Sequence, residues 1–359
     1  MWAGSGCSAD GGMTDMKKFA YVGCRTTKER NARGKGIKVF DAESWELLQT
    51  LEGLVNPSYL CFDRTGNFLY TIHGDFSEIS LFRVDRNNGR ISLLNTASTG
   101  GVNPVHLSVD AGNRWVFVAN LQTGTVAVIP RNDDGTLGTL KELYTMPGKS
   151  DGTVSHPHQV MQDNTGRFLI VSCQGRKAGF GQVDVFRIDG GNGMLEKTCT
   201  VRSREIAEPR HVAFHANNKY CYGVNEKDYS VTFYEFDQNN GTLTPKQILP
   251  TLPETYTGDG WASGIIMTND SRHVIVSNRK HDSITSFSVS PENGMLKFAD
   301  CIKTGGGQPR FITLDPEGRI LAANETTDTL TFFTVDGEGK FSRENMTVET
   351  ESPVCVVFG

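Results

Sequence analysis

The residues best suited to chemistry lie at one recurring position, directly after a proline or its replacement at the start of an apolar run. This position holds a histidine once and an arginine twice. An imidazole can accept and return a proton, and a guanidinium group binds carboxylates or phosphates and stabilises an oxyanion. The seven residues at this position, called the anchor position, are Ser58, Val105, His158, Arg210, Ala262, Arg310 and Val354.

A second recurring position lies five residues before the first apolar residue of a later alternating run. It holds two carboxylates and a further guanidinium group, which suit proton transfer and anion binding. An asparagine comes directly before it in every case, and asparagine at a strand end is most often a turn cap rather than a catalytic group. The four residues at this position, called the hairpin position, are Leu121, Glu226, Arg279 and Glu325.

Both positions recur because the chain repeats one unit, in which short runs of alternating apolar residues are separated by polar turns. The alternation in VFVANL, SVTFYEF and TLTFFTV predicts strands rather than helices. Successive units begin 44–53 residues apart, which is the period of β-propeller blades. The units begin at Pro57, Pro104, Pro157, Pro209, Trp261, Pro309 and Pro353.

The seventh unit is divided between the two ends of the chain. Only VCVVFG follows Pro353, while FAYVG and GIKVFDAES near the start supply the missing strands. Pairing the termini in one blade would close the ring and leave no free sheet edge. We therefore expect an all-β, seven-bladed β-propeller over residues 18–359, preferred to a β-sandwich. Residues 1–17 are expected to be a disordered leader or a remnant of expression.

In such a ring, equivalent positions of different blades lie at the same distance from the axis. We therefore expect His158, Arg210, Glu226, Arg279, Arg310 and Glu325 to converge on a central channel. His106, two residues after its anchor proline, is a further candidate for the channel lining. The alternative is structural, because arginine and glutamate in adjacent blades can simply neutralise one another. Their coincidence at equivalent positions favours a site.

Composition excludes several other classes of protein. The formal net charge of −5 offers no general basic surface for nucleic acid. Eight scattered cysteines show no zinc-ligand spacing and indicate free thiols in a reducing compartment. No apolar stretch is long enough to span a membrane, and the start lacks the pattern of a secretory signal, so a cytoplasmic location is expected. We expect no metal and no cofactor, and the sequence leaves the oligomeric state open.

The motifs HPHQV, EPRHVAFH, GVNEKD, SNRKHDS, GGQPRFITLDPEG and AANETTDTL resemble those of the lactonase family of seven-bladed propellers. That family includes bacterial 6-phosphogluconolactonases and the fungal carboxy-cis,cis-muconate cyclase. The resemblance covers Lys18 to Gly359 and implies that His158, Arg210, Glu226 and Arg279 are active-site residues. The segment SCQGRKAGFGQ, with Gln174, departs from the family pattern and leaves the substrate uncertain.

The leading hypothesis is hydrolysis of an anionic sugar-acid lactone, with 6-phosphogluconolactone as the expected substrate. Glu226 or His158 would be the base, and the sequence leaves this choice open because it depends on their relative pKa values. Arg210 and Arg279 would hold the anionic group and stabilise the oxyanion, while Arg310, Glu325 and His106 would bind substrate. The alternatives are lactone formation by a carboxymuconate cycloisomerase and a non-catalytic propeller that binds a protein partner.

Overall fold

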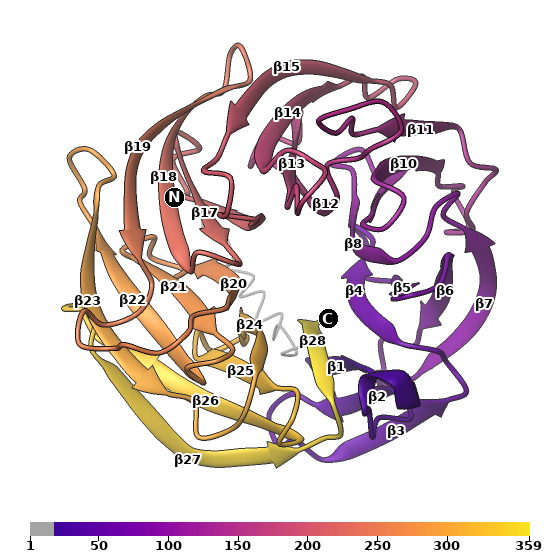
Figure 1. The fold of residues 1–359 in the computed structure, drawn as a ribbon. Coiled ribbons are helices and arrows are strands. Elements are labelled where there is room, and N and C mark those ends of the chain that lie inside the picture. The colour runs from indigo at the N-terminus through magenta and orange to yellow at the C-terminus, as the bar shows by residue number, and fades with distance from the viewer. Residues whose placement is uncertain (1–17) are drawn as a thin grey trace, which may run out of the picture.

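The structure, a computed structural model, describes residues 18–359 as seven four-stranded sheets. The sheets are arranged around one axis as the blades of a propeller (Figure 1). Neighbouring strands within each sheet are antiparallel. Blades are numbered 1 to 7 from the one that starts at Pro57, so blade 7 contains both ends of the described chain. The predicted fold is confirmed, and the predicted leader, residues 1–17, lies outside the described residues.

The innermost strand of each blade lines the axis and contacts the innermost strands of both neighbouring blades. These strands run from an anchor residue, usually proline, at one end of the channel to the other end. In the order of blades 1 to 7 they are β4 (Pro57–Phe62), β8 (Pro104–Val109), β12 (Pro157–Gln162), β16 (Pro209–Phe214), β20 (Ala262–Met267), β24 (Pro309–Leu314) and β28 (Pro353–Phe358).

The second and third strands of each blade form the core, which consists of apolar clusters shared between adjacent blades. Alternating side chains point to the two faces of each sheet, and both faces are covered. The second strands are β5 (Phe68–His73), β9 (Trp115–Asn120), β13 (Phe168–Cys173), β17 (Tyr220–Asn225), β21 (His273–Asn278), β25 (Ile320–Asn324) and β1 (Phe19–Cys24). The third strands are β6 (Glu78–Val84), β10 (Thr125–Pro130), β14 (Gln182–Ile188), β18 (Ser230–Asp237), β22 (Ser283–Val289), β26 (Thr329–Val335) and β2 (Gly36–Asp41).

The outer strands are the most exposed and complete each blade. They are β7 (Ile91–Ser98), β11 (Glu142–Thr145), β15 (Leu195–Arg202), β19 (Thr242–Pro250), β23 (Leu296–Lys303), β27 (Phe341–Glu349) and β3 (Leu47–Glu52). Helical structure within residues 18–359 is confined to one 3₁₀ turn, η1 (Lys28–Arg30), in the loop between β1 and β2. No helix in this part of the chain is long and apolar enough to cross a membrane. The seven cysteines described are unpaired thiols, as predicted.

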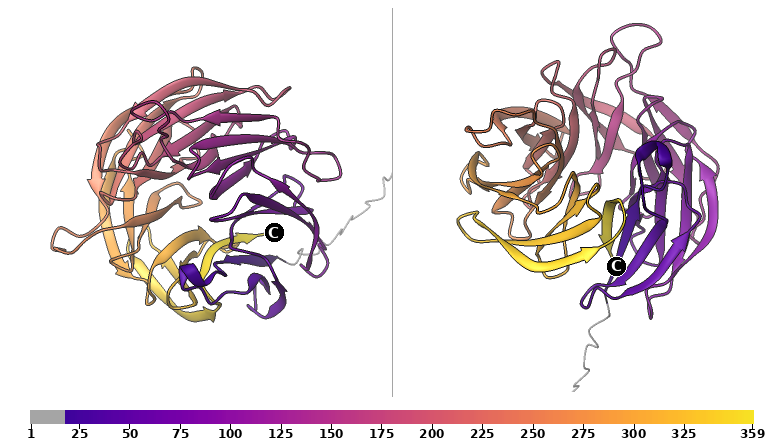
Figure 2. Two further views of the ribbon diagram at one scale, coloured as in Figure 1. Left: turned by 45° about the vertical axis from the view of Figure 1, so that its right-hand side comes forward. Right: turned by 60° about the horizontal axis from the view of Figure 1, so that its bottom comes forward.

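Blade 7 closes the ring by combining the two ends of the chain. The C-terminal strand β28 pairs with β1, which pairs in turn with β2 and β3. Figure 2 shows the yellow C-terminal strand lying beside the indigo N-terminal strands. The inner strand β28 also contacts β24 and β4 in the neighbouring blades. The predicted closure is therefore confirmed.

A repeated tyrosine joins some blades to the next one along the ring. Each lies in a second strand, is fully buried, and donates its hydroxyl hydrogen bond to a glycine carbonyl oxygen of the following blade. A buried phenol needs such a partner, so the bond fixes the spacing between blades as well as satisfying the hydroxyl. The pairs are Tyr21 with Gly89 at 2.8 Å, Tyr70 with Gly135 at 2.7 Å and Tyr222 with Gly294 at 2.9 Å.

A bulge follows the anchor residue in each inner strand. In blades 3, 4 and 6, the pairing with the second strand shifts across His158, Arg210 and Arg310, so each is the extra residue. A bulge bends the strand and redirects the side chain of the extra residue. The local backbone thus explains why the anchor position carries side chains that project into the channel.

The anchor assigned to blade 5 from the sequence is wrong. Ala262 pairs with Asn278 as Pro209 pairs with Asn225, so Ala262 takes the place of the proline and Trp261 comes before it. The shift in register then falls on Ser263 and the next residue. No proline marks this blade, and only the hydrogen-bond register identifies the true anchor.

Candidate functional site

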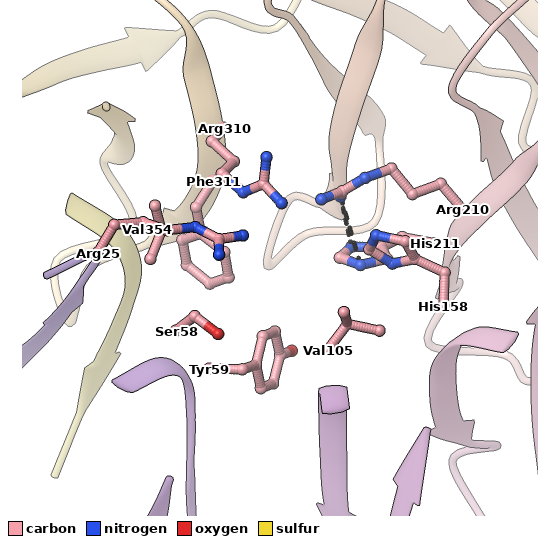
Figure 3. A pocket seen from close by; sticks show the side chains of 10 residues that line it. All are labelled: Arg25, Ser58, Tyr59, Val105, His158, Arg210, His211, Arg310, Phe311 and Val354. Carbon is pink, nitrogen blue, oxygen red and sulfur yellow. Dashed lines mark hydrogen bonds between the residues drawn. The ribbon is translucent and has the colours of Figure 1, made fainter. Parts of the chain in front are cut away.

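A cavity lies on the axis, at the end of the channel where the inner strands begin. Three guanidinium groups turn toward one another across it, with two imidazoles beside them (Figure 3). The lining residues are Arg25, Ser58, Tyr59, Val105, His158, Arg210, His211, Arg310, Phe311 and Val354.

The residues of the hairpin position are held by one backbone hydrogen bond, in which each donates its N–H to the carbonyl oxygen of the residue before the anchor. The bond is 2.8 Å long for Glu226 and Arg279 and 3.1 Å for Glu325. The same bond places Gln174 and Arg25 at the hairpin position of blades 3 and 7. The asparagines that precede this position hydrogen-bond to hydroxyl groups within their hairpins, as expected of a structural role.

Glu226 lies behind the cavity wall, accepts hydrogen bonds from three side chains and forms an ion pair with a fourth. Its Oε2 accepts from Arg210 Nε at 2.9 Å and Gln174 Nε2 at 2.9 Å, and lies 3.1 Å from Arg279 Nη2. Its Oε1 accepts from Trp261 Nε1 at 2.8 Å. A carboxylate with this many donors is fixed in its ionised form and holds the two arginines in place.

Burial raises the pKa of Glu226, but the Arg279 and Arg210 charges and the Trp261 hydrogen bond outweigh it and lower the pKa to about 2. A carboxyl whose pKa is lower in the folded state stabilises the fold above its ordinary pKa, and this contribution is lost as pH falls toward the folded-state value. Glu226 therefore contributes fully at neutral pH and loses its contribution between about pH 4.5 and pH 2.

We expect Glu226→Gln to reduce the free energy of unfolding at pH 7 by about 3–5 kcal/mol, because it leaves two buried guanidinium groups without a counter-charge. The difference from wild type should shrink between pH 4.5 and pH 3. Urea unfolding at a series of pH values measures both, with the exposed Glu235→Gln in the same blade as the control. A difference that stays the same at pH 3 and pH 7 would contradict this role.

Arg210 is buried and connects Glu226 to the cavity. Its Nη1 donates to the Ser263 carbonyl oxygen at 2.8 Å and lies 3.3 Å from His211 Nε2. Its Nη2 has no hydrogen-bond partner in residues 18–359, and the side chain lines the cavity. Arg279 does not line the cavity: its Nη2 donates to the Ala262 carbonyl oxygen at 2.9 Å. The two arginines thus have different environments.

On the other side of the cavity, Arg25 and Arg310 face each other (Figure 3). Both form ion pairs with Glu325. Each guanidinium group has a nitrogen 3.8 Å from a carboxylate oxygen of Glu325, beyond hydrogen-bonding distance. Arg25 Nη1 also bonds to Asp75 at 3.1 Å. Arg310 makes no side-chain hydrogen bond within residues 18–359. Most donors of this pair are therefore free.

The two imidazoles of the cavity are neutral at physiological pH. Burial and the Arg210 charge hold the pKa values of His158 and His211 well below the ordinary value. The ring centroids of these histidines lie 5.1 Å apart. The buried Nδ1 of His158 has no hydrogen-bond partner in the described chain. A neutral imidazole has one ring nitrogen that can accept a proton.

His106 lies deeper, in a second cavity toward the other end of the channel. Its ring lies 4.1 Å from that of Tyr59, which lines both cavities. Burial, followed by the Arg210 charge, lowers its pKa to about 3. Among residues 18–359, no three histidine, cysteine, aspartate or glutamate side chains are grouped so that they could hold a metal ion.

The structure thus divides the sequence candidates into three groups. His158, Arg210 and Arg310 line the cavity. Glu226 and Glu325 do not line it but pair with Arg210 and Arg310, and Arg279 pairs with Glu226. His106 lines the second cavity, and its ring lies 5.6 Å from that of His211. Sequence reasoning missed Arg25 and did not assign His211 to the cavity. It noted Gln174 only as a departure from the family pattern, and its amide now proves to contact Glu226.

The fold and the site together define a class of protein: a propeller whose central cavity is rich in arginine and histidine. The family described as "Lactonase, 7-bladed beta-propeller" matches residues 19–358. The chain belongs to this family. The family resemblance found in the sequence, and with it the expectation of a lactonase-type enzyme, is therefore confirmed.

Several relatives support the assignment. The chain is 30% identical over 351 residues to a 6-phosphogluconolactonase of Bacillus subtilis, covering 95% of this chain and 98% of that protein. It is 28% identical over 346 residues to a 6-phosphogluconolactonase of Formosa agariphila, covering 90% and 94%. The structure of a periplasmic gluconolactonase of Pseudomonas aeruginosa superposes with a TM-score of 0.84 at 25% identity, covering 95% of this chain and 98% of that one.

Proposed function

We propose that this protein hydrolyses the lactone ring of an anionic sugar acid, and that 6-phosphogluconolactone is its substrate. The observation that carries this proposal is the cavity in which a neutral imidazole, His158, and a free donor of Arg210 face the same space. The names of the relatives support the substrate class. The excess of arginine over carboxylate around the cavity supports an anionic ligand.

In the proposed reaction, His158 takes a proton from a water molecule as the water oxygen attacks the lactone carbonyl carbon. Arg210 donates from Nη2 to the carbonyl oxygen, which becomes the oxyanion of the tetrahedral intermediate. The intermediate then breaks the bond between the carbonyl carbon and the ring oxygen. The protonated His158 returns its proton to that oxygen, so water is added across the ester bond and a hydroxy acid is released.

The choice of base follows from the hydrogen bonds of the two candidates. Both carboxylate oxygens of Glu226 are occupied by donors. His158 lines the cavity, and neither of its ring nitrogens has a hydrogen-bond partner within residues 18–359. An anionic substrate would offset the arginine charges that lower the pKa of His158, and would so increase its basicity when it is needed. We therefore assign Glu226 and Arg279 to positioning Arg210.

The test compares two assays on purified protein. Acid release at constant pH from 6-phosphogluconolactone measures hydrolysis, and loss of ultraviolet absorbance from a carboxymuconate measures the cyclisation of a conjugated diene. We expect acid release well above the spontaneous rate and no loss of diene absorbance. Diene loss without acid release would favour the cycloisomerase, and a negative result in both assays would favour a non-catalytic propeller.

A further inference from the structure

We propose that Arg25 and Arg310 form a clamp for a phosphomonoester, which binds the end of the substrate remote from the lactone carbonyl. This inference rests on the proposed function, because it assigns the substrate's phosphate to one side of the same cavity. It adds Arg25, which the sequence did not identify. It also separates the two arginines of the clamp from Arg210, which acts on the carbonyl.

The first support is the number of hydrogen-bond donors left free. A guanidinium group carries five N–H donors, and buried donors are normally satisfied. The buried Arg25 Nε has no hydrogen-bond partner in the described chain. The partly exposed Arg310 side chain makes no hydrogen bond within residues 18–359. Glu325, the carboxylate between them, is too distant at 3.8 Å to satisfy either group. The clamp therefore offers donors that a bound oxyanion would use.

The second support is charge. Arg25 and Arg310 repel each other, and burial together with the Arg310 charge lowers the pKa of Arg25 to about 9. Asp75 pairs with Arg25 and also with Arg30, and Glu325 pairs with Arg25 and Arg310. Three guanidinium groups thus share two carboxylates, which leaves an excess positive charge. A phosphomonoester carries close to two negative charges and three acceptor oxygens, so it would neutralise this excess and bond to both groups. A ligand carboxylate would supply less negative charge and fewer acceptor oxygens than a phosphomonoester.

The third support is that Arg25 is held in place from outside the cavity. Asp75 accepts from Arg25 Nη1 at 3.1 Å, from Arg30 Nε at 2.8 Å and from Asn56 Nδ2 at 3.2 Å. Asp75 has a backbone φ of 72°, in the left-handed region that non-glycine residues seldom adopt. This contact fixes one edge of the Arg25 guanidinium group and leaves the rest facing Arg310.

The arrangement of the cavity side chains supports binding of the phosphate and of the lactone carbonyl on opposite sides of the cavity. In Figure 3, Arg25 and Arg310 lie on one side of the cavity, and Arg210, His158 and His211 lie on the other. A substrate with an anionic group at one end and a carbonyl at the other would reach both walls. Figure 3 also shows Ser58 and Tyr59 along the edge between the two walls.

The experiment measures two variants, Arg25→Gln and Arg310→Gln, with two lactones that differ only in the phosphate. We expect each variant to raise KM for 6-phosphogluconolactone about 10- to 100-fold, the effect of losing one charged hydrogen bond, while kcat changes less than about threefold. KM for unphosphorylated gluconolactone should rise much less, because that lactone has no phosphate for the clamp to bind. Arg33→Gln, which alters an exposed arginine of the same loop, is the matched control. Equal losses with both lactones, or no loss with either, would overturn the clamp.

A binding measurement keeps this test separate from the proposed activity. We expect the wild-type protein to bind inorganic phosphate in calorimetry and each variant to bind it at least tenfold more weakly. If the wild type binds phosphate through the clamp but hydrolyses no lactone, the proposed function fails and the clamp stands. If phosphate does not bind, or binds equally to correctly folded variants, the clamp fails whatever the activity. Arg310→Gln removes no hydrogen bond, so it remains informative if Arg25→Gln does not fold.

Discussion

Replacing His158 with glutamine is expected to lower kcat for 6-phosphogluconolactone by about 10³-fold, within the range of about 10²–10⁴ for a general base. Glutamine keeps a polar side chain of similar size but cannot take the proton of the attacking water. KM should change little, because the arginines that bind the anionic substrate remain in place. Initial-rate kinetics at pH 7 measure both constants.

The dependence of kcat/KM on pH tests the same prediction in a second way. The pKa of His158 in the free enzyme lies well below 6.5, so the imidazole stays neutral and kcat/KM should be flat between about pH 6.5 and pH 8. His215→Gln alters a histidine in the turn between β16 and β17 and serves as the control. Equal kcat values for His158→Gln and wild type would remove His158 from the proposed mechanism.

Replacing Arg210 with lysine is expected to lower kcat by about 10²–10³-fold, the usual loss when one oxyanion donor is removed. One guanidinium group here bonds to Glu226 and the Ser263 carbonyl oxygen while its Nη2 faces the cavity. A lysine ammonium group has a single nitrogen, so it cannot replace the three separate, coplanar nitrogens that make these contacts in arginine. The expected loss is therefore in the chemical step, although the charge is kept.

Two comparisons make the Arg210 prediction specific. Arg204→Lys changes an exposed arginine in the loop between blades 3 and 4 that pairs with Asp228, and its activity should match that of the wild type. Arg279→Lys should lower kcat less than Arg210→Lys, because Arg279 contacts Glu226 but does not line the cavity. A larger effect at Arg279 than at Arg210 would show that the oxyanion donor has been assigned to the wrong residue.

Much of the fold could be predicted because its determinants are local. Alternating strands, turn residues and the 44–53-residue period are visible in the sequence, and the complementary end fragments predict the closure of the ring. The blade 5 anchor could not be located in this way. Trp261 and Ala262 differ by one residue, and only pairing with Asn278 in the neighbouring strand distinguishes them.

The candidate site was predicted in part, for equally physical reasons. Counting back from the third strand finds Glu226 but misses Arg25, because a longer loop containing η1 separates β1 from β2. Counting forward from FAYVGC to the residue after the second strand would have found Arg25. The partners of Glu226 could not be predicted, because Gln174 and Trp261 meet it only through the spacing between blades.

The central claim is that side chains remote along the chain meet around the propeller axis and open a lactone there. Its most direct test is the rate of acid release from 6-phosphogluconolactone, measured for the wild type and His158→Gln against buffer alone. The account predicts rapid release by the wild type and a rate close to that of buffer for the variant. A wild-type rate no faster than buffer, or a variant as fast as the wild type, would contradict it.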